Sequence, residues 1–171
     1  MAESEEFLRA TLGSMDLVYN IARKVVPRPE DAEDLAQETY LAAFRAWLDH
    51  RRPRKVEPWL ATICLNLGRS GFRHRARRPL EVELTEGAAM EDVSSEEAAL
   101  SAMDRDALRR AMWSLSEEQR IAMALVDLGG FSIDEAARMM GSPRGTVLSR
   151  LFRGRRALAA LLESEIRERE P

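Results

Sequence analysis

Apolar side chains recur at helical spacing through most of the chain, and alternating patterns typical of strands are nearly absent. The first stripe predicts a helix over residues 5–26. Pro27 ends that helix, and Pro29 can occupy the first turn of a second one, over residues 29–48. An Arg- and Pro-rich loop follows, and a third helix is predicted over residues 59–75. We therefore expect an all-α protein.

The C-terminal third carries the clearest helix start and stop signals. Ser-x-x-Gln and Ser-x-x-Glu capping boxes begin at Ser116 and Ser132, and Gly141 fits the residue that ends a helix. These signals predict a short helix over residues 133–140, a tight Gly-Ser-Pro turn, and a longer basic helix from about Pro143. This is how a helix-turn-helix places its reading helix in the major groove of DNA.

Charge is unevenly distributed, although the formal net charge is only −3. Residues 51–78 hold nine basic side chains against one acid, and residues 142–162 hold five arginines and no acid. Between them, residues 80–103 hold seven acids and no base. Two basic blocks around an acidic one indicate two contacts with anionic surfaces, joined by an exposed, self-repelling linker.

The domain organisation follows from these patterns. We expect two small helical domains joined by an acidic flexible linker. Their predicted bounds are residues 1–78, 79–103 for the linker, and 104–171. Each domain is too small to bury a large core by itself.

The basic helix carries the candidate DNA contacts. Its first turn is where a recognition helix meets base edges, and we expect arginines farther along to bind phosphate, which positions the protein without specifying sequence. The alternative is a solvated basic helix in an ordinary bundle. The candidates are Arg144, Thr146, Ser149, Arg150, Arg153, Arg155 and Arg156.

Several function classes are disfavoured. The single cysteine, Cys64, lies in an apolar setting that favours packing over redox sensing, and it excludes an intrachain disulfide. We expect neither a metal nor a cofactor, and no enzyme, because phosphate-binding glycine loops, nucleophile elbows and His-rich motifs are absent from the sequence. No apolar run approaches the roughly 20 residues that span a bilayer. We expect a cytoplasmic protein.

Two segments resemble a known family. Residues 31–40 read DAEDLAQETY and lead into LAAFRAW, and residues 141–158 read GSPRGTVLSRLFRGRRAL. They resemble regions 2 and 4 of the extracytoplasmic-function (ECF) sigma factors, the small two-domain group IV members of the sigma-70 family. The resemblance implies a monomeric subunit that binds core RNA polymerase and directs transcription initiation by recognising minus-35 and minus-10 promoter elements.

The resemblance assigns a docking role to the acidic face of the second helix. That face would bind the clamp helices of the polymerase beta-prime subunit. Spacings of three and four residues put its carboxylates on one side of a helix, where they can pair with arginines. Acids at a helix start are also favoured by the helix dipole alone. The residues concerned are Asp31, Asp34, Gln37 and Glu38.

The third helix would read the minus-10 element by the same resemblance. The implied contacts are Asn66, Arg69, Arg73, Arg75 and Arg77. Asparagine is a suitable base reader, and closely spaced arginines can follow phosphates and stack on unpaired bases. Trp47 and Trp59 are either stacking platforms or, as is usual for tryptophan on an apolar helix face, part of the core.

The chain departs from the family pattern at three places. Ser70 replaces a common Asp, Val56 replaces a common Phe, and an Arg-Pro-Arg run replaces a Gly near the loop start. These departures leave the minus-10 sequence preference open. The resemblance also implies an anti-sigma factor as partner. A stand-alone helix-turn-helix regulator is the alternative, but it would leave DAEDLAQETY without a role and would usually need to dimerise.

Overall fold

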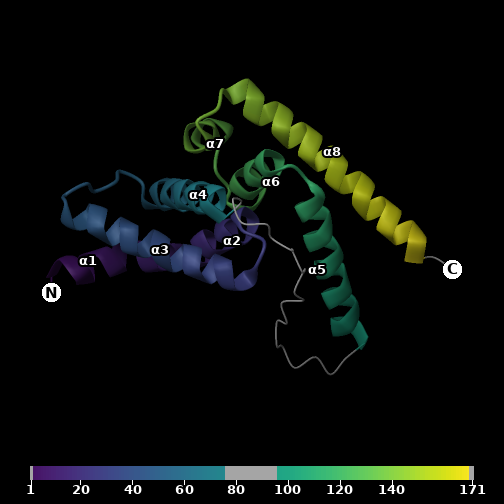
Figure 1. Cartoon of the computed structure of the whole chain (residues 1–171), viewed down its shortest axis with the longest axis horizontal. Helices are drawn as coiled ribbons and strands as arrows, with labels where there is room; N and C mark the ends of the chain where they lie inside the picture. The colour runs from purple at the N-terminus through teal and green to yellow at the C-terminus, as the bar shows by residue number, and fades with distance from the viewer. Residues whose placement is uncertain (1, 76–95, 170–171) are drawn as a thin grey trace.

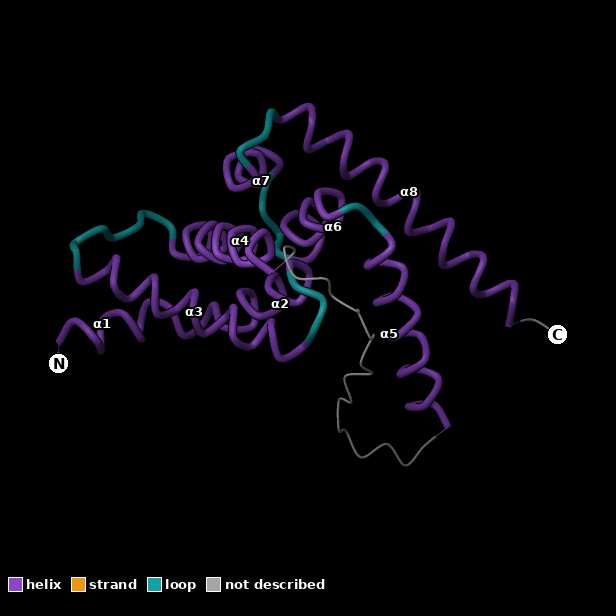
Figure 2. The backbone as a smooth tube through the Cα atoms, viewed as in Figure 1, coloured by secondary structure: helices purple, strands orange, loops and turns teal. Residues whose placement is uncertain are grey.

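A computed structural model describes residues 2–75 and 96–169, and within these ranges the backbone is helix joined by short loops, with no strand (Figures 1 and 2). The all-α fold class is therefore confirmed. The elements are α1 (Ala2–Thr11), η1 (Leu12–Ser14), α2 (Met15–Val25), α3 (Pro29–Leu48), α4 (Val56–Arg75), α5 (Glu96–Ser114), α6 (Glu117–Met123), η2 (Ala124–Leu128), α7 (Ile133–Met140) and α8 (Arg144–Arg169).

The N-terminal domain is built on α2, α3 and α4, which pack on one another around fully buried Val18, Ile21, Leu60 and Leu65. Gly68 permits the closest approach, since a Cβ there would lie 2.2 Å from Cγ1 of Val25. Any larger residue would require the Val25 side chain or the two helices to shift. The position of α4 therefore depends on this glycine.

Helix α1 closes one end of this domain through an aromatic cluster. The Phe7 ring lies 5.6 Å from that of Trp47 and 5.1 Å from that of Phe44, measured between centroids. Trp47 is buried, so it belongs to the core and is not a stacking platform for a base. The Tyr40 hydroxyl adds a hydrogen bond to the Thr11 carbonyl at 3.1 Å.

The prediction of a single helix over residues 5–26 is wrong, because the structure divides this segment. A 3₁₀ turn, η1, divides it into α1 and α2. Gly13 lies in this turn, and glycine is among the poorest helix formers. The Thr11 hydroxyl donates to the Phe7 carbonyl at 2.8 Å, which provides a local alternative to helical bonding.

Two other helix starts differ from expectation. Helix α4 begins at Val56 and not at Trp59, because Pro58 is tolerated in a first turn, where its missing N–H is not needed. Helix α5 begins at Glu96, inside the segment expected to be linker. Adjacent glutamates followed by alanines favour a helix start there. The remainder of the expected linker, residues 79–95, lies outside the described residues.

The C-terminal domain packs α6, η2, α7 and α8 around Ile121, Leu125, Val147 and Leu151. Both predicted capping boxes are present at the starts of α6 and α7. Gly141 ends α7 in the left-handed region, with φ of 60°. The helix-turn-helix geometry predicted from the sequence is therefore formed.

The two domains contact each other along α4 and α2. Helix α7 packs on α4, and α6 with η2 packs on α2 (Figure 1). The described chain is thus in a closed arrangement, with part of one domain covering the other.

Candidate nucleic-acid interface

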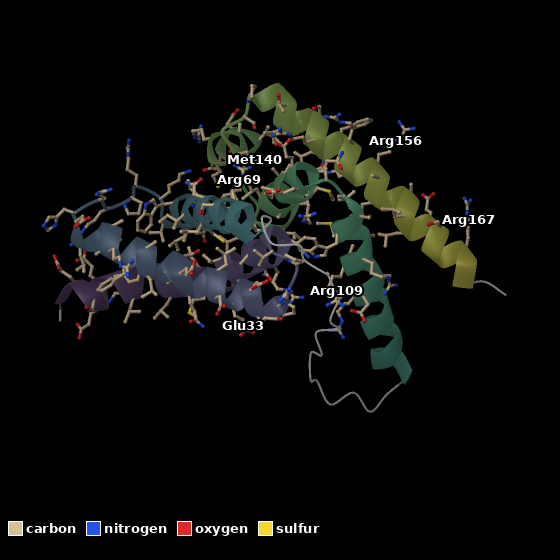
Figure 3. The ribbon with its side chains drawn as sticks, in the orientation of Figure 1. Glu33, Arg69, Arg109, Met140, Arg156 and Arg167 are labelled. Atoms are coloured by element: carbon tan, nitrogen blue, oxygen red, sulfur yellow. The ribbon has the colours of Figure 1, made fainter. Side chains whose placement is uncertain are left out.

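Helix α8 has one side in the core and one side in solvent. Val147, Leu151 and Gly154 are buried, and a Cβ at Gly154 would lie 2.9 Å from the Met123 sulfur. The opposite side presents polar residues to solvent, and Figure 3 shows Arg156 pointing away from the rest of the domain. This side is free to approach a ligand. Thr146, in the first turn of α8, is half-buried.

Three of the arginines predicted to contact DNA pair with acids of the same domain. The Arg144 Nε lies 3.1 Å from the Asp134 carboxylate, which links α8 to α7. Arg150 pairs with Glu118 of α6 and donates a 2.8 Å hydrogen bond to the Ser142 hydroxyl. Its side chain is only 15% exposed. Arg150 is therefore directed into the domain and not outward.

Arg155 is paired in the same way. Its Nε and Nη2 donate to the two carboxylate oxygens of Asp127 at 3.1 and 2.5 Å, and this contact raises the pKa of Arg155. Arg153 folds back onto the carbonyl and hydroxyl of Ser149, each at 3.3 Å. Arg156 has no hydrogen bond or ion pair within the described residues. Ser149, Arg153 and Arg156 are thus exposed polar residues of α8 that form no ion pair within the described residues, whereas the exposed Arg144 and Arg155 each pair with an acid.

Phe152 was missed by the sequence reasoning. It is 67% exposed on α8, and Leu148, one turn earlier, is 42% exposed. An aromatic residue three positions after Ser149 in an otherwise basic segment is a signal that the sequence does contain.

The acidic face of α3 is exposed as predicted. Asp34, Gln37 and Glu38 are exposed, and Asp31 is half-buried, while Ala32 on the opposite side of the helix is buried. The sequence-predicted docking residues therefore share one accessible side of the helix. Figure 3 shows Glu33, which precedes Asp34, at the outer edge of the domain.

The predicted minus-10 residues lie on α4, and part of that helix is covered by α7. Asn66 is exposed, but Arg69 is half-buried and donates to the Met140 carbonyl at 3.5 Å (Figure 3). Arg73 and Arg75 belong to the last turn of α4, and Arg77 lies outside the described residues.

A cleft of about 570 Å³ separates the start of α4 from α7. Trp59 and Thr62 line it from α4, and Arg138 and Met139 line it from α7. Trp59 is half-buried, so in the closed arrangement it faces the other domain.

A buried arginine links the domains at the other end of the junction. Arg120 of α6 is 6% exposed and donates from Nε to the Lys24 carbonyl of α2 at 2.7 Å. Its Nη1 donates to the Leu115 carbonyl at 3.1 Å, and its guanidinium lies 3.9 Å from the Trp113 ring centroid. Burial lowers the pKa of Arg120. Because both hydrogen bonds end on neutral carbonyls, directional bonding and stacking compensate for the buried charge.

A second bridge crosses the junction at the surface. The Lys55 ammonium lies 2.8 Å from the Glu135 carboxylate, which also accepts from the Ser132 backbone and hydroxyl. The hydrogen bond from Lys55 is the largest cause that lowers the pKa of Glu135 to about 2, and the hydrogen bonds from Ser132 add to it. The carboxylate that caps α7 therefore also joins α7 to the α4 side of the junction.

Cys64 lies on the buried side of α4, and burial raises its pKa to about 11. This placement supports packing over redox sensing. Among the described residues, no group of His, Cys, Asp and Glu could hold a metal ion. No helix in the same part of the chain is both long enough and apolar enough to cross a membrane.

Each of the two domains matches a known protein family. Residues 14–78 match the family described as Sigma-70 region 2, and residues 105–158 match the family described as Sigma-70, region 4. The ECF RNA polymerase sigma factor EcfG of Rhodopseudomonas palustris is 39% identical over 132 residues, which cover 77% of this chain and 71% of that protein. The RNA polymerase sigma-H factor of Pseudomonas aeruginosa is 32% identical over 160 residues, with 88% and 83% covered.

A solved structure resembles most of the chain, across both domains. It is the sigma factor RpoE of Bartonella quintana in complex with the anti-sigma factor NepR, with a TM-score of 0.75 and 30% identity. The likeness covers 93% of this chain and 98% of that one, so it includes both domains.

Proposed function

The chain belongs to the ECF group of the sigma-70 family and is an RNA polymerase sigma factor, and we propose that three of its surfaces divide the work of initiation. Sigma factors are transcription initiation factors. The order and geometry of the two domains support this proposal. Along the chain, an exposed acidic helix face is followed by a basic helix and then by a formed helix-turn-helix.

The acidic side of α3 is the proposed docking surface for the clamp helices of the beta-prime subunit. Asp34 and Glu38 are exposed one turn apart, which suits bidentate pairing with arginines of a partner helix. Gln37 extends the same exposed side, and Asp31 stands at its start. Charge pairing of this kind also accelerates association.

Helix α4 is the proposed reader of the minus-10 element. The exposed Asn66 is suited to a base edge, and Arg69 to a phosphate or an unpaired base. In the closed arrangement Arg69 is half-buried beside α7 and lies 3.5 Å from the Met140 carbonyl, so we propose that α7 moves away before Arg69 engages DNA. Arg73, Arg75 and Arg77 extend the proposed basic track.

Helix α8 is the proposed reader of the minus-35 element in the major groove. Ser149, Arg153 and Arg156 face outward and are proposed to make the first contacts. Arg144, Arg150 and Arg155 each hold an acid within the domain. Any of these three arginines that binds a DNA phosphate must first release its carboxylate partner. An arginine that keeps its partner instead positions α8. Thr146, in the first turn, completes the set.

The closed chain cannot contact the minus-35 and minus-10 elements at the same time. Elements centred about 25 base pairs apart are separated by roughly 85 Å of duplex at 3.4 Å per step. Arg69 contacts Met140, and Ser149 follows nine residues later, so even an extended chain between them spans only about 32 Å. Promoter recognition therefore requires the domains to separate, and polymerase docking is the proposed cause.

The partner of the closed form is proposed to be an anti-sigma factor. The likeness across both domains to a sigma factor solved with its anti-sigma factor supports this proposal. Such a protein would stabilise the contacts between α7 and α4. The free protein is proposed to be a monomer that acts in the cytoplasm, where polymerase and promoter DNA are found.

The stand-alone regulator is not favoured, because it gives no role to the region 2 domain. A hydroxyl-radical footprint with purified core polymerase tests the proposal. Protection at two separated elements that requires both proteins is the expected result. Protection of one symmetrical site by this protein alone would overturn it.

A further inference from the structure

Four cationic side chains from both domains gather where the end of α2 meets α5 and α6, and we call them the junction cluster. They are Arg23 and Lys24 of α2, Arg109 of α5 and Arg120 of α6. Arg120 donates to the Lys24 carbonyl at 2.7 Å, and its guanidinium lies 3.9 Å from the Trp113 ring centroid. Arg109 lies one turn before Trp113, on the side of α5 turned toward the N-terminal domain (Figure 3). The cluster is therefore complete only in the closed arrangement.

Acidic side chains do not balance this charge. Arg109 is paired with Asp106 of its own helix at 3.3 Å. Arg23 and Lys24 are half-buried, and neither forms an ion pair within the described residues. Burial lowers the pKa of Lys24, and the charges of the three neighbouring arginines lower it further. Lys24 therefore stands among positive charges without an acid partner in the described part of the chain.

The position at the end of α2 explains only half of the cluster. Cations at the carboxyl end of a helix are favoured by the helix dipole, which accounts for Arg23 and Lys24 in that helix alone. Arg109 and Arg120 come from the other domain and bring further positive charge to the same place. Burial lowers the pKa of Arg120 more than the charge of Glu117 raises it. Closing the chain therefore brings like charges together, and a bound anion would relieve their repulsion.

The donors that converge here suit a phosphate group. Guanidinium and ammonium groups bind both phosphates and carboxylates. The junction cluster is drawn from three helices of two domains, so its donors approach from different directions. A phosphate has oxygens on several sides to accept them, whereas a carboxylate offers two in one plane. A pyrophosphate group also concentrates its charge in one compact unit, while an acidic peptide spreads its charge over about 3.3 Å per residue.

We propose that the junction cluster binds the pyrophosphate group of a small anion, and that this anion holds the two domains in the closed arrangement. The group is either free pyrophosphate or part of a nucleoside diphosphate. An anion that contacts both domains binds the closed chain and not the open one. It therefore reduces opening by the factor one plus its concentration divided by its dissociation constant. The consequence for transcription rests on the proposed function, in which promoter recognition requires the domains to separate.

Isothermal titration calorimetry tests the site with the full chain, using pyrophosphate and adenosine diphosphate at low ionic strength without divalent cations. Lys24→Met removes the cation that lacks an acid partner and should weaken binding of the tighter anion roughly tenfold or more. Arg109→Met should weaken it from the other domain. Arg45→Met is the matched control, because Arg45 is exposed on α3 and lies outside the cluster, and it should bind as the wild type does. Equal losses in Arg45→Met and Lys24→Met would overturn the location of the site.

Thermal unfolding separates a ligand-binding role of Lys24 from a structural one. Without the anion, Lys24→Met should melt at the wild-type temperature or above it, because the substitution removes repulsion among the cations. With the anion, the melting temperature of the wild type should rise and that of Lys24→Met should not. A lower melting temperature of Lys24→Met without the anion, with no loss of anion affinity, would make Lys24 a structural residue and overturn the proposal. Sodium chloride at the same ionic strength is the control for screening, and an equal rise with this salt would also overturn it.

Binding to core polymerase measures the effect of the anion on opening. Fluorescence anisotropy of the labelled protein gives its apparent affinity for core polymerase in the absence of nucleoside triphosphates. At ten times the dissociation constant of the anion, the affinity of the wild type should fall roughly tenfold. Lys24→Met should be affected far less, and this variant corrects for any action of the anion on the polymerase itself. Unchanged wild-type affinity at a saturating anion concentration would overturn the role of the anion in holding the closed form.

The remaining outcomes separate the ligand class and the proposed function. Tighter binding of a hexaglutamate peptide than of either phosphate compound would identify a site for an acidic protein segment and overturn the phosphate assignment. If core polymerase and promoter DNA give no start-specific transcripts with this protein, the proposed function fails. Calorimetry and thermal unfolding do not depend on transcription, so loss of pyrophosphate binding in Lys24→Met would still support the site in that case.

Discussion

The geometry of the domain junction predicts that the substitution Arg120→Met separates the two domains. Methionine has a similar length but cannot donate, so the carbonyls of Lys24 and Leu115 lose their donor. The Leu115 bond and the stacking on Trp113 lie within one domain, whereas the bond to Lys24 joins two. Hydrogen bonds from a charged donor contribute about 1.5–3 kcal/mol. Loss of the interdomain bond should therefore raise the ratio of open to closed chains roughly 10- to 150-fold.

Removing the buried charge offsets part of the loss within the C-terminal domain. The guanidinium no longer pays its desolvation penalty, and methionine fills the space with apolar atoms. We therefore expect a decrease of about 2 kcal/mol in the free energy of unfolding of that domain, within the usual range for single substitutions. The domain should stay folded while the junction opens.

Distances between spin labels measure the opening. Cysteines introduced at Glu33 and Ser164, which are exposed and lie in different domains, accept labels, while the native Cys64 is buried. The wild type should give one narrow distance distribution, and Arg120→Met a broad one shifted to longer distances. Arg156→Met is the matched control, because that side chain is solvent-directed, and its distribution should match the wild type (Figure 3). Identical distributions for Arg120→Met and the wild type would refute the role of Arg120 as the interdomain bond.

Reversing charge with Asp34→Arg and Glu38→Arg should weaken core polymerase binding at least tenfold with unchanged circular dichroism, and unchanged affinity would remove the docking assignment. Gly68→Ala should lower the free energy of unfolding by about 1–3 kcal/mol in urea titrations, since the Val25 side chain or the two helices must shift; a neutral effect would show that the packing relaxes. Because the folded pKa of Glu135 is lowered to about 2, its ionised form stabilises the fold above the ordinary pKa near 4.5. The stability difference between the wild type and Glu135→Gln should therefore be constant above pH 5 and disappear as pH falls towards 2; a constant difference down to pH 2 would contradict the shift. The Cys64 thiol, with a pKa near 11, should react with Ellman's reagent at pH 8 only after denaturation, and rapid labelling of the native protein would contradict its burial.

Local signals accounted for much of the fold. The capping boxes at Ser116 and Ser132 and the break at Gly141 were predictable, because each motif acts within four residues. The exposed acidic side of α3 was also predictable from spacing alone. The helix starts at Val56 and Glu96 were missed, because helix ends depend on small free-energy differences.

Long-range pairing was not predictable from the sequence. Arg144, Arg150 and Arg155 read as a basic face, but each pairs with an acid from another element, up to 32 residues away for Arg150 and Glu118. The burial of Arg120 likewise depends on the packing of α6 against α2, for which the sequence carries no local signal. Phe152 differs from these cases, because its spacing from Ser149 was a signal in the sequence that could have been used.

Run-off transcription tests whether this chain directs initiation by RNA polymerase. Purified core polymerase and genomic promoter DNA would be incubated with and without the protein, and the 5′ ends of the transcripts mapped. If it does, transcripts will depend on the protein, and their starts will share two upstream elements about 25 base pairs apart, too far for a closed chain to reach. Transcription unaffected by the protein, together with specific binding of the protein alone to duplex DNA, would contradict it.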